Sequence, residues 1–156
     1  VNRKLPHLGN RGQAIQEYFS ALSERLRDVR ICCGDWMRVL GDSPTTILGM
    51  TAVFLDPPYA VTDRDTNCYG DTDSVTVAHE VRAWCLERGD NPLLRICLCG
   101  YDGEHNELER HGWSVVAWKA AGGHGSQRKD GTNENAKRER CWFSPACIDP
   151  DERRLF

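Results

Sequence analysis

Short apolar runs that alternate with amphipathic stretches are the feature that most limits how this 156-residue chain can fold. Apolar runs bounded by glycine, proline or aspartate predict strands over 29–33, 51–55, 93–99, 113–119 and 140–143. Apolar residues at helical spacing predict helices over 12–28, from about residue 74 onward, and over 103–111. Strands that alternate with helices indicate an α/β sheet with helices on its faces. Because no helix separates the last two strands, we expect them to pair as an antiparallel hairpin around a long polar loop, 121–138.

Charge is distributed unevenly along the chain. The net charge is 20 − 23 = −3, which excludes a strongly basic coat protein for nucleic acid. Residues 1–30 carry +3, residues 31–123 carry −7 and residues 124–156 carry +1. Positive charge at the two ends can bind a polyanion, since phosphate contacts need local charge. On charge alone, an ordinary solvated surface is the better explanation of the pattern.

We expect neither a secretory signal nor a membrane segment at the start of the chain. Residues 1–12 are polar, and no apolar run in the chain approaches the roughly 20 residues of a membrane helix. The length and the 40% hydrophobic content are typical of one globular domain. Because the first residue is Val1, we expect the chain to be a portion of a longer protein.

The sequence predicts no metal site. None of the eight cysteines has C-x-x-C spacing, and we expect them to be small, buried hydrophobic residues in a reduced cytosol. The histidines lack a second ligand at metal spacing, so we expect solvated or capping roles for His79, His105, His111 and His124. The tryptophans are expected to pack in the core or on the sheet: Trp84, Trp113, Trp118 and Trp142.

Asp56-Pro57-Pro58-Tyr59, directly after the apolar run 51–55, is the strongest chemical signal. At the carboxyl end of a parallel strand, such a turn faces the crevice in which α/β folds bind ligands. Two prolines remove two N–H donors and leave carbonyl acceptors, Asp56 adds a carboxylate, and Tyr59 adds an aromatic face. Carboxylate and carbonyl oxygens can accept both hydrogens of an exocyclic amine while the aromatic ring stacks on its base. The pattern therefore favours a site for a planar amine over a simple proline turn.

These residues lie in a context that resembles the S-adenosylmethionine-dependent amino-methyltransferases, and most of all the phage-type and Dam-like DNA adenine-N6 methyltransferases. AVFLDPPYA is similar to the catalytic [D/N/S]-P-P-[Y/F/W] motif of that family. RICCGDW is similar to its cofactor-contacting segment, and RKLPHLGNRGQ to a segment of phage-type members. The final GWSVVAWKAAGGHGSQ and NAKRERCWFSP resemble its closing hairpin, so that the resemblance covers nearly the whole chain.

The resemblance implies a Rossmann-like class I methyltransferase sheet and a role for each matched residue. The catalytic motif would consist of Asp56, Pro57, Pro58 and Tyr59. Asp56 and the Pro57 carbonyl would accept hydrogen bonds from the adenine N6, and Tyr59 would stack on a base flipped out of double-stranded DNA. Asp35 and Trp36 would contact S-adenosylmethionine, although a turn aspartate is the simpler interpretation of Asp35 from the residues alone. Candidate DNA contacts lie at the start of the chain and in the long loop: Arg3, Lys4, His7, Arg11, Ser126, Arg128, Lys129 and Asn135. A bacterial or phage-infected cytoplasm would be the setting, and no metal would be needed.

The chain departs from the family in its cofactor segment. The F-x-G-x-G loop that precedes Gly-Asp-Trp in the family is absent, and Gly9-x-x-Gly12 does not replace it because no strand precedes it. The acidic residue after the second family strand is missing too. We therefore expect a C-terminal portion of a methyltransferase domain that lacks the first strands and, by itself, binds the cofactor weakly or not at all. Two alternatives stay open: an RNA guanine-N2 methyltransferase relative, and a non-catalytic phage-derived remnant that only binds nucleic acid.

Overall fold

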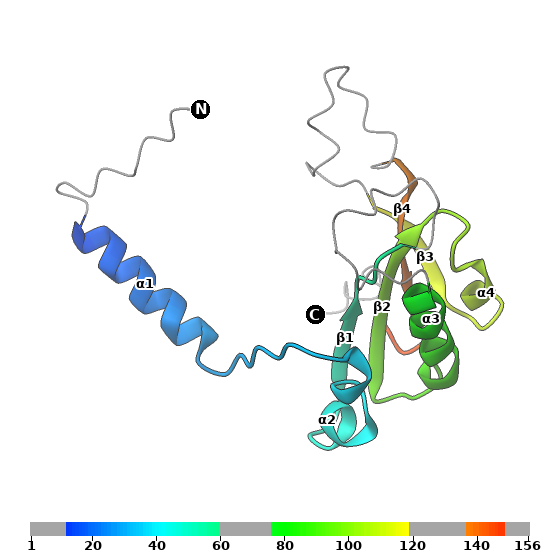
Figure 1. Cartoon of the computed structure of the whole chain (residues 1–156), viewed down its shortest axis with the longest axis horizontal. Helices are drawn as coiled ribbons and strands as arrows, with labels where there is room; N and C mark the ends of the chain where they lie inside the picture. The colour runs from blue at the N-terminus through cyan, green and yellow to red at the C-terminus, as the bar shows by residue number, and fades with distance from the viewer. Residues whose placement is uncertain (1–11, 60–75, 119–136, 149–156) are drawn as a thin grey trace. The chain divides into compact units, whose positions relative to one another are not determined.

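The computed structural model of this chain describes residues 12–59, 76–118 and 137–148. It divides the chain into two compact units, Val1–Arg38 and Val39–Phe156, and each is described by itself. Figure 1 labels the elements of both. In the part of the chain that the structure describes, no helix has the length and apolar character needed to cross a membrane.

The first unit contains helix α1 (Gly12–Leu26) and the 3-10 turn η2 (Trp36–Arg38). The rings of Tyr18 and Phe19 on α1 contact each other edge to face, with centroids 5.7 Å apart. The strand predicted over 29–33 is wrong, because the backbone there is irregular and Ile31 is 95% exposed. An apolar run becomes a strand only where it can pair, and none of the described residues pairs with this one. Cys32 and Cys33 on this run are exposed, contrary to the expectation that they are buried.

The second unit is α/β and is built around one mixed sheet of four strands in the order β1-β2-β4-β3. Strand β1 (Thr51–Leu55) pairs in parallel with β2 (Leu94–Tyr101). The antiparallel edge consists of β4 (Glu139–Phe143), which lies between β2 and β3 (Ser114–Ala117). The predicted C-terminal antiparallel hairpin is thus confirmed by the pairing of β3 with β4.

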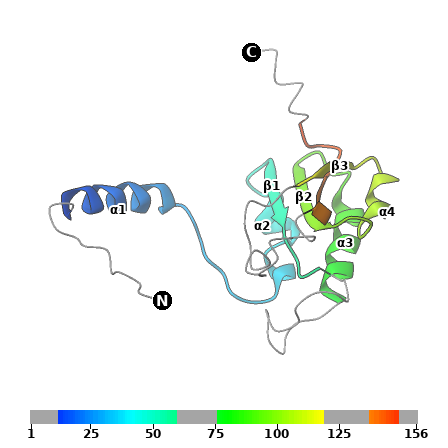
Figure 2. The same cartoon turned by 90° about the horizontal axis from the view of Figure 1, so that it is seen from above.

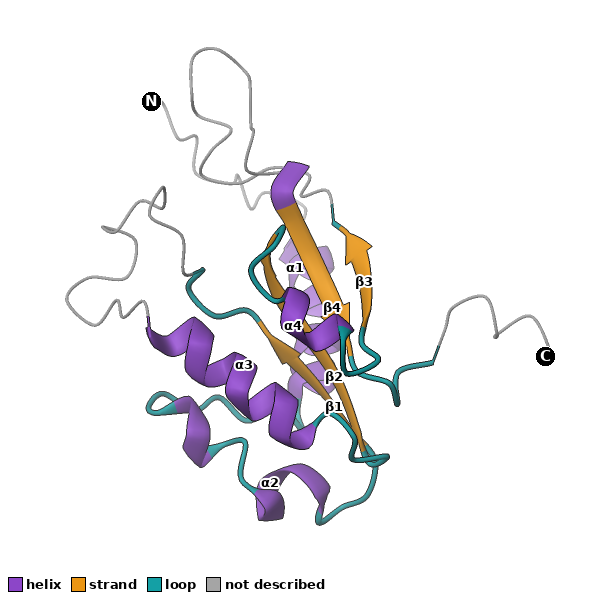
Figure 3. Ribbon diagram, turned by 90° about the vertical axis from the view of Figure 1, so that its right-hand side faces the viewer, coloured by secondary structure: helices purple, strands orange, loops and turns teal. Residues whose placement is uncertain are grey.

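The helices of this unit are α2 (Asp42–Thr46), α3 (Thr76–Arg88) and α4 (Asn106–Glu109). Figures 2 and 3 show α3 and α4 on the same face of the sheet, where α3 lies against β2. An ion pair between Arg88 and Asp42 joins the end of α3 to α2. Arg82 on α3 donates a hydrogen bond of 2.9 Å to the Glu104 carbonyl before α4. These polar contacts hold the helices together at the edges of an apolar layer.

The core lies between α3, α4 and the face of the sheet that they cover. Alternate residues of β2 point into it, and the buried side chains include Leu94, Ile96, Leu98, Val81 and Cys85. Trp142 on β4 is fully buried. Its ring meets the His105 ring edge to face, with centroids 5.1 Å apart, and its Nε1–H donates a hydrogen bond of 3.2 Å to Glu109 Oε1. Trp113 is also buried, so the packing role expected for these two tryptophans is confirmed.

His105 is a correction to the expectation of a solvated or capping histidine. Its side chain is 1% exposed, and it makes no capping hydrogen bond although it precedes α4. Burial lowers its pKa to about 4, so the ring is neutral at physiological pH. A Cβ at position 100 would lie 2.7 Å from the ring, and Gly100 therefore provides the space that His105 occupies.

The opposite face of the sheet carries Phe54, Cys97, Cys99, Cys141 and Phe143, which line a cavity. Phe54 on this face remains 69% exposed. The described residues of this unit therefore do not supply the second layer of helices that the fold prediction implied. The open face is where the predicted catalytic turn emerges.

Candidate active site

The Asp56-Pro57-Pro58-Tyr59 turn begins where β1 ends, as predicted. Because β1 and β2 are parallel and Leu55 pairs with Leu98, the turn leaves the sheet beside the carboxyl end of β2. Pro57 is buried, Pro58 and Tyr59 are half-buried, and the Asp56 side chain is exposed. Proline rings lock the backbone between the carboxylate and the phenol, so both groups are held at the edge of the sheet.

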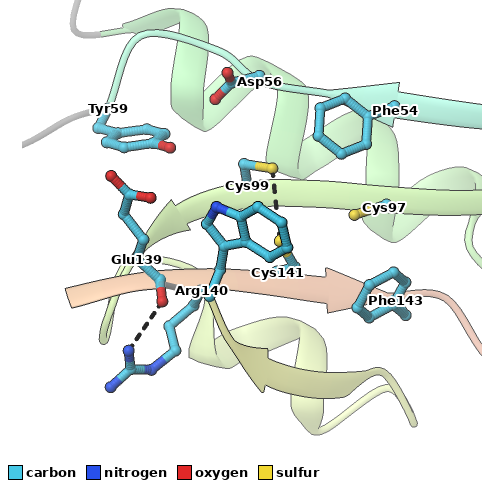
Figure 4. A pocket seen from close by; sticks show the side chains of 10 residues that line it. Phe54, Asp56, Tyr59, Cys97, Cys99, Glu139, Arg140, Cys141 and Phe143 are labelled. Carbon is cyan, nitrogen blue, oxygen red and sulfur yellow. Dashed lines mark hydrogen bonds between the residues drawn. The ribbon is translucent and has the colours of Figure 1, made fainter. Parts of the chain in front are cut away.

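Asp56 and Tyr59 line one cavity of about 410 Å³, together with side chains from β2 and β4. Figure 4 shows the Asp56 carboxylate and the Tyr59 ring at one end of it, and the rings of Phe54 and Phe143 at the other. Its walls are mostly apolar, with carboxylates at one end, which is the common composition of small-molecule sites. The cavity can take a planar ring and offer oxygen acceptors to one edge of it.

A second aromatic residue fixes the position of Tyr59. The Tyr59 ring meets the Tyr101 ring edge to face, with centroids 4.5 Å apart. The Arg138 guanidinium lies 4.7 Å from the centroid of the Tyr101 ring, within the range of a cation–π contact. Tyr59 thus packs against the end of β2 and lines the cavity.

Asp56 and Glu139 place two acidic groups in the cavity, whose lining also includes Arg140. Burial, followed by the negative charge of Asp56, raises the pKa of Tyr59 above its ordinary value, so the phenol stays protonated. Burial and the charge of Asp56 also raise the pKa of Glu139, whose carboxylate points toward Tyr59 in Figure 4. The cavity therefore combines hydrogen-bond acceptors with a neutral aromatic hydroxyl, a combination suited to a cationic or amine-bearing ligand.

Glu139 and Trp118 are cavity residues that the sequence interpretation missed. Trp118 was expected to pack in the core or on the sheet, but it is 59% exposed and lines the cavity. Both residues come from the C-terminal hairpin, which reaches the turn after β1 only through the pairing of β2 with β4. The resemblance of the terminal segment to the family hairpin was the one signal that pointed to this part of the chain.

Asp35 and Trp36, the predicted cofactor contacts, belong to the first unit. Asp35 Oδ1 accepts a hydrogen bond of 2.8 Å from the Met37 backbone N–H and so caps the turn η2. Trp36 is half-buried and Asp35 is exposed. The geometry seen at Asp35 is that of a turn aspartate, the simpler of the two interpretations. One carboxylate oxygen of Asp35 is therefore used locally.

The predicted DNA contacts lie outside the described residues. Arg3, Lys4, His7 and Arg11 precede the first described residue, and Ser126, Arg128, Lys129 and Asn135 fall between the second and third described ranges. His124 and Cys68 lie outside them too. Their predicted roles stay predictions.

No protein-family model, curated protein or solved structure matches this chain. The family resemblance consequently depends on the motifs in the sequence. The cavity at the end of β1 adds an independent reason to ask which chemistry these residues support.

Proposed function

We propose that this chain carries the catalytic region of an S-adenosylmethionine-dependent DNA adenine-N6 methyltransferase. The observation that carries the proposal is the joint position of Asp56 and Tyr59 in one cavity at the carboxyl end of a parallel strand. A carboxylate acceptor beside an aromatic ring is the pair that an exocyclic amine on a flat base needs. The sheet order β1-β2-β4-β3 with its antiparallel edge is compatible with the C-terminal half of a Rossmann-like sheet.

The residues of this chain would act by orientation. Asp56 and the Pro57 carbonyl would accept the two N6 hydrogens, which directs the nitrogen lone pair away from the ring. Tyr59, braced by Tyr101, would stack on the flipped adenine and repay part of the few kcal/mol that base flipping costs. S-adenosylmethionine, when bound, supplies the methyl group as an electrophile. Most of the rate gain would then come from alignment of the amine with that methyl group.

The cofactor is expected to bind weakly to these 156 residues alone. Asp35 and Trp36 offer an acceptor and an indole ring, residue types that suit the edge and face of the cofactor adenine. However, Asp35 Oδ1 already caps η2, and the chain has no F-x-G-x-G loop. Calorimetric titration of the chain with S-adenosylmethionine is expected to give a dissociation constant weaker than micromolar. Micromolar binding would show that the chain holds a complete cofactor site.

Comparing nucleic acid substrates tests the proposed function against its alternatives. Transfer of labelled methyl groups by the gene product that contains this chain is expected on duplex DNA and absent on structured RNA. Preference for RNA would favour the guanine-N2 methyltransferase relative. Binding of both nucleic acids without transfer, by a protein that also binds S-adenosylmethionine, would favour the non-catalytic remnant.

Two substitutions of Tyr59 separate stacking from hydrogen bonding. Tyr59→Ala removes the ring and is expected to weaken productive DNA binding by about 1–3 kcal/mol, the usual value of one base–aromatic stack. Tyr59→Phe keeps the ring and its edge contact with Tyr101, and is expected to retain most of the activity. Measurement of kcat/KM for both variants checks this. Equal loss in both variants, or no loss in Tyr59→Ala, would remove the stacking role.

A further inference from the structure

Three cysteine side chains meet on the open face of the sheet. Cys97 and Cys99 are two residues apart on β2 and therefore point to the same face, and Cys141 on β4 is the cross-strand partner of Cys99. Their sulfur atoms all lie within 4.8 Å of one another, and Cys99 Sγ lies 3.8 Å from Cys141 Sγ. In Figure 4 a dashed line marks the hydrogen bond between the thiols of Cys99 and Cys141, and Cys97 lies beside them.

The spacing of these sulfur atoms matches the edge of a metal tetrahedron. With Zn–S bonds of about 2.3 Å, two thiolates of a tetrahedral site lie about 3.8 Å apart. The Cys99–Cys141 pair already has this separation, and a shift of about 1 Å by the third sulfur would complete a three-thiolate face. We propose that Cys97, Cys99 and Cys141 form a binding site for a thiophilic divalent cation of the Zn²⁺ type.

The surroundings of the cluster leave one coordination position open. Cys99 and Cys141 are each 8% exposed, and all three cysteines line the cavity. A cation held by three sulfurs would direct its fourth position into that cavity, whose lining includes the carboxylates of Asp56 and Glu139. Three protein ligands with one open position is the arrangement of zinc sites that bind an exchangeable ligand. Each thiol would release its proton to the buffer as its sulfur binds the metal.

The sequence pattern predicted no metal site, whereas the structure brings three cysteines together. The expectation considered C-x-x-C spacing, whereas the cluster combines C-x-C on one strand with a cysteine 42 positions from Cys99 on the neighbouring strand. The strand register supplies the third ligand. The proposal stands apart from the methyltransferase proposal, because metal binding can be measured without any methyl donor or DNA.

Titration with Co²⁺ tests the site directly, since thiolate-to-cobalt charge transfer and tetrahedral ligand-field bands report sulfur ligation. The parent chain carries serine at Cys32, Cys33 and Cys68, which removes two exposed cysteines and one outside the described residues. A non-thiol reductant keeps the other thiols reduced. We expect one equivalent of Co²⁺ to bind with both spectral signatures and to be displaced by Zn²⁺. Cys97→Ser removes a proposed ligand and is expected to weaken Co²⁺ binding at least about 10–100-fold. That is the loss already caused by changing a residue that only hydrogen-bonds to a metal ligand.

Cys147→Ser is the matched control, because Cys147 is a half-buried thiol that contacts Ser144 and lies outside the cluster. It is expected to bind Co²⁺ as the parent does. Because Cys99 and Cys141 are buried, their variants can misfold, and alkylation mapping of the parent avoids this problem. Zn²⁺ is expected to protect the three cluster cysteines and not Cys147. No saturable sulfur-to-cobalt band in the parent, or equal affinity in Cys97→Ser and Cys147→Ser, would overturn the proposal.

Discussion

Replacing Asp56 with alanine is expected to lower methyl transfer to adenine at least about 100-fold, the cost of losing alignment at a reacting centre. The Asp56 side chain is exposed at the end of β1 and lines the cavity, so its removal leaves no hole in the core. The variant should therefore keep the circular dichroism spectrum and unfolding midpoint of the parent. Single-turnover kinetics with duplex DNA and the gene product that contains this chain measure the effect.

Two further variants sharpen this result. Asp56→Asn keeps an oxygen acceptor at the same position and is expected to retain more activity than Asp56→Ala. Asp90→Ala removes another exposed aspartate, which lies in the turn before β2 and so at the opposite end of the parallel strands from Asp56, and is expected to change nothing. Full activity in Asp56→Ala would contradict the role of the carboxylate. Equal loss in Asp90→Ala would point to a general effect of charge.

Replacing Trp142 with alanine is expected to have the largest effect on stability, about 3–5 kcal/mol. Trp142 is fully buried on β4, the strand that joins β2 to β3, and it contacts His105 and Glu109. Small domains are stable by only about 5–15 kcal/mol in total, so this loss brings the second unit close to unfolding. Urea denaturation followed by far-ultraviolet circular dichroism measures it without relying on tryptophan fluorescence.

Trp118→Ala serves as the comparison for the same residue type. Trp118 is 59% exposed, and its truncation is expected to change the free energy of unfolding by less than about 0.5 kcal/mol. Trp142→Phe keeps an aromatic ring but loses the hydrogen bond to Glu109, and an intermediate effect is expected. A Trp142→Ala midpoint close to that of the parent would contradict the proposed core.

The local elements of the second unit could be predicted because their patterns are local. The run 51–55 is bounded by a turn on one side and by Asp56 on the other, and the strand β1 has those bounds. The helix with Val81 and Cys85 on one face buries both of them. Strands over 93–99 and 140–143 are found as β2 and β4 with small shifts at their ends. These patterns record which side chains of an element must leave water, and the pattern can be seen in the sequence of that element alone.

Features that depend on pairing between distant elements could not be predicted. The run 29–33 has the composition of a strand, but strand formation requires a partner that no local pattern can supply. The burial of His105 follows from Gly100 and Trp142, which lie on two different strands. Cys141 lies beside Cys97 and Cys99 because of the register between β2 and β4. For the site, Asp56 and Tyr59 were found from their motif, while Glu139 and Trp118 required the fold.

The most direct test of the proposed chemistry is the identity of the methylated atom. Duplex DNA is incubated with S-adenosylmethionine and the gene product that contains this chain, digested to nucleosides and analysed by mass spectrometry. We predict N6-methyladenine as the methylated base, and none when Asp56→Ala replaces the parent. A methyl group on another base or another atom of adenine, or no methylated base from a folded protein that binds the cofactor, would contradict it.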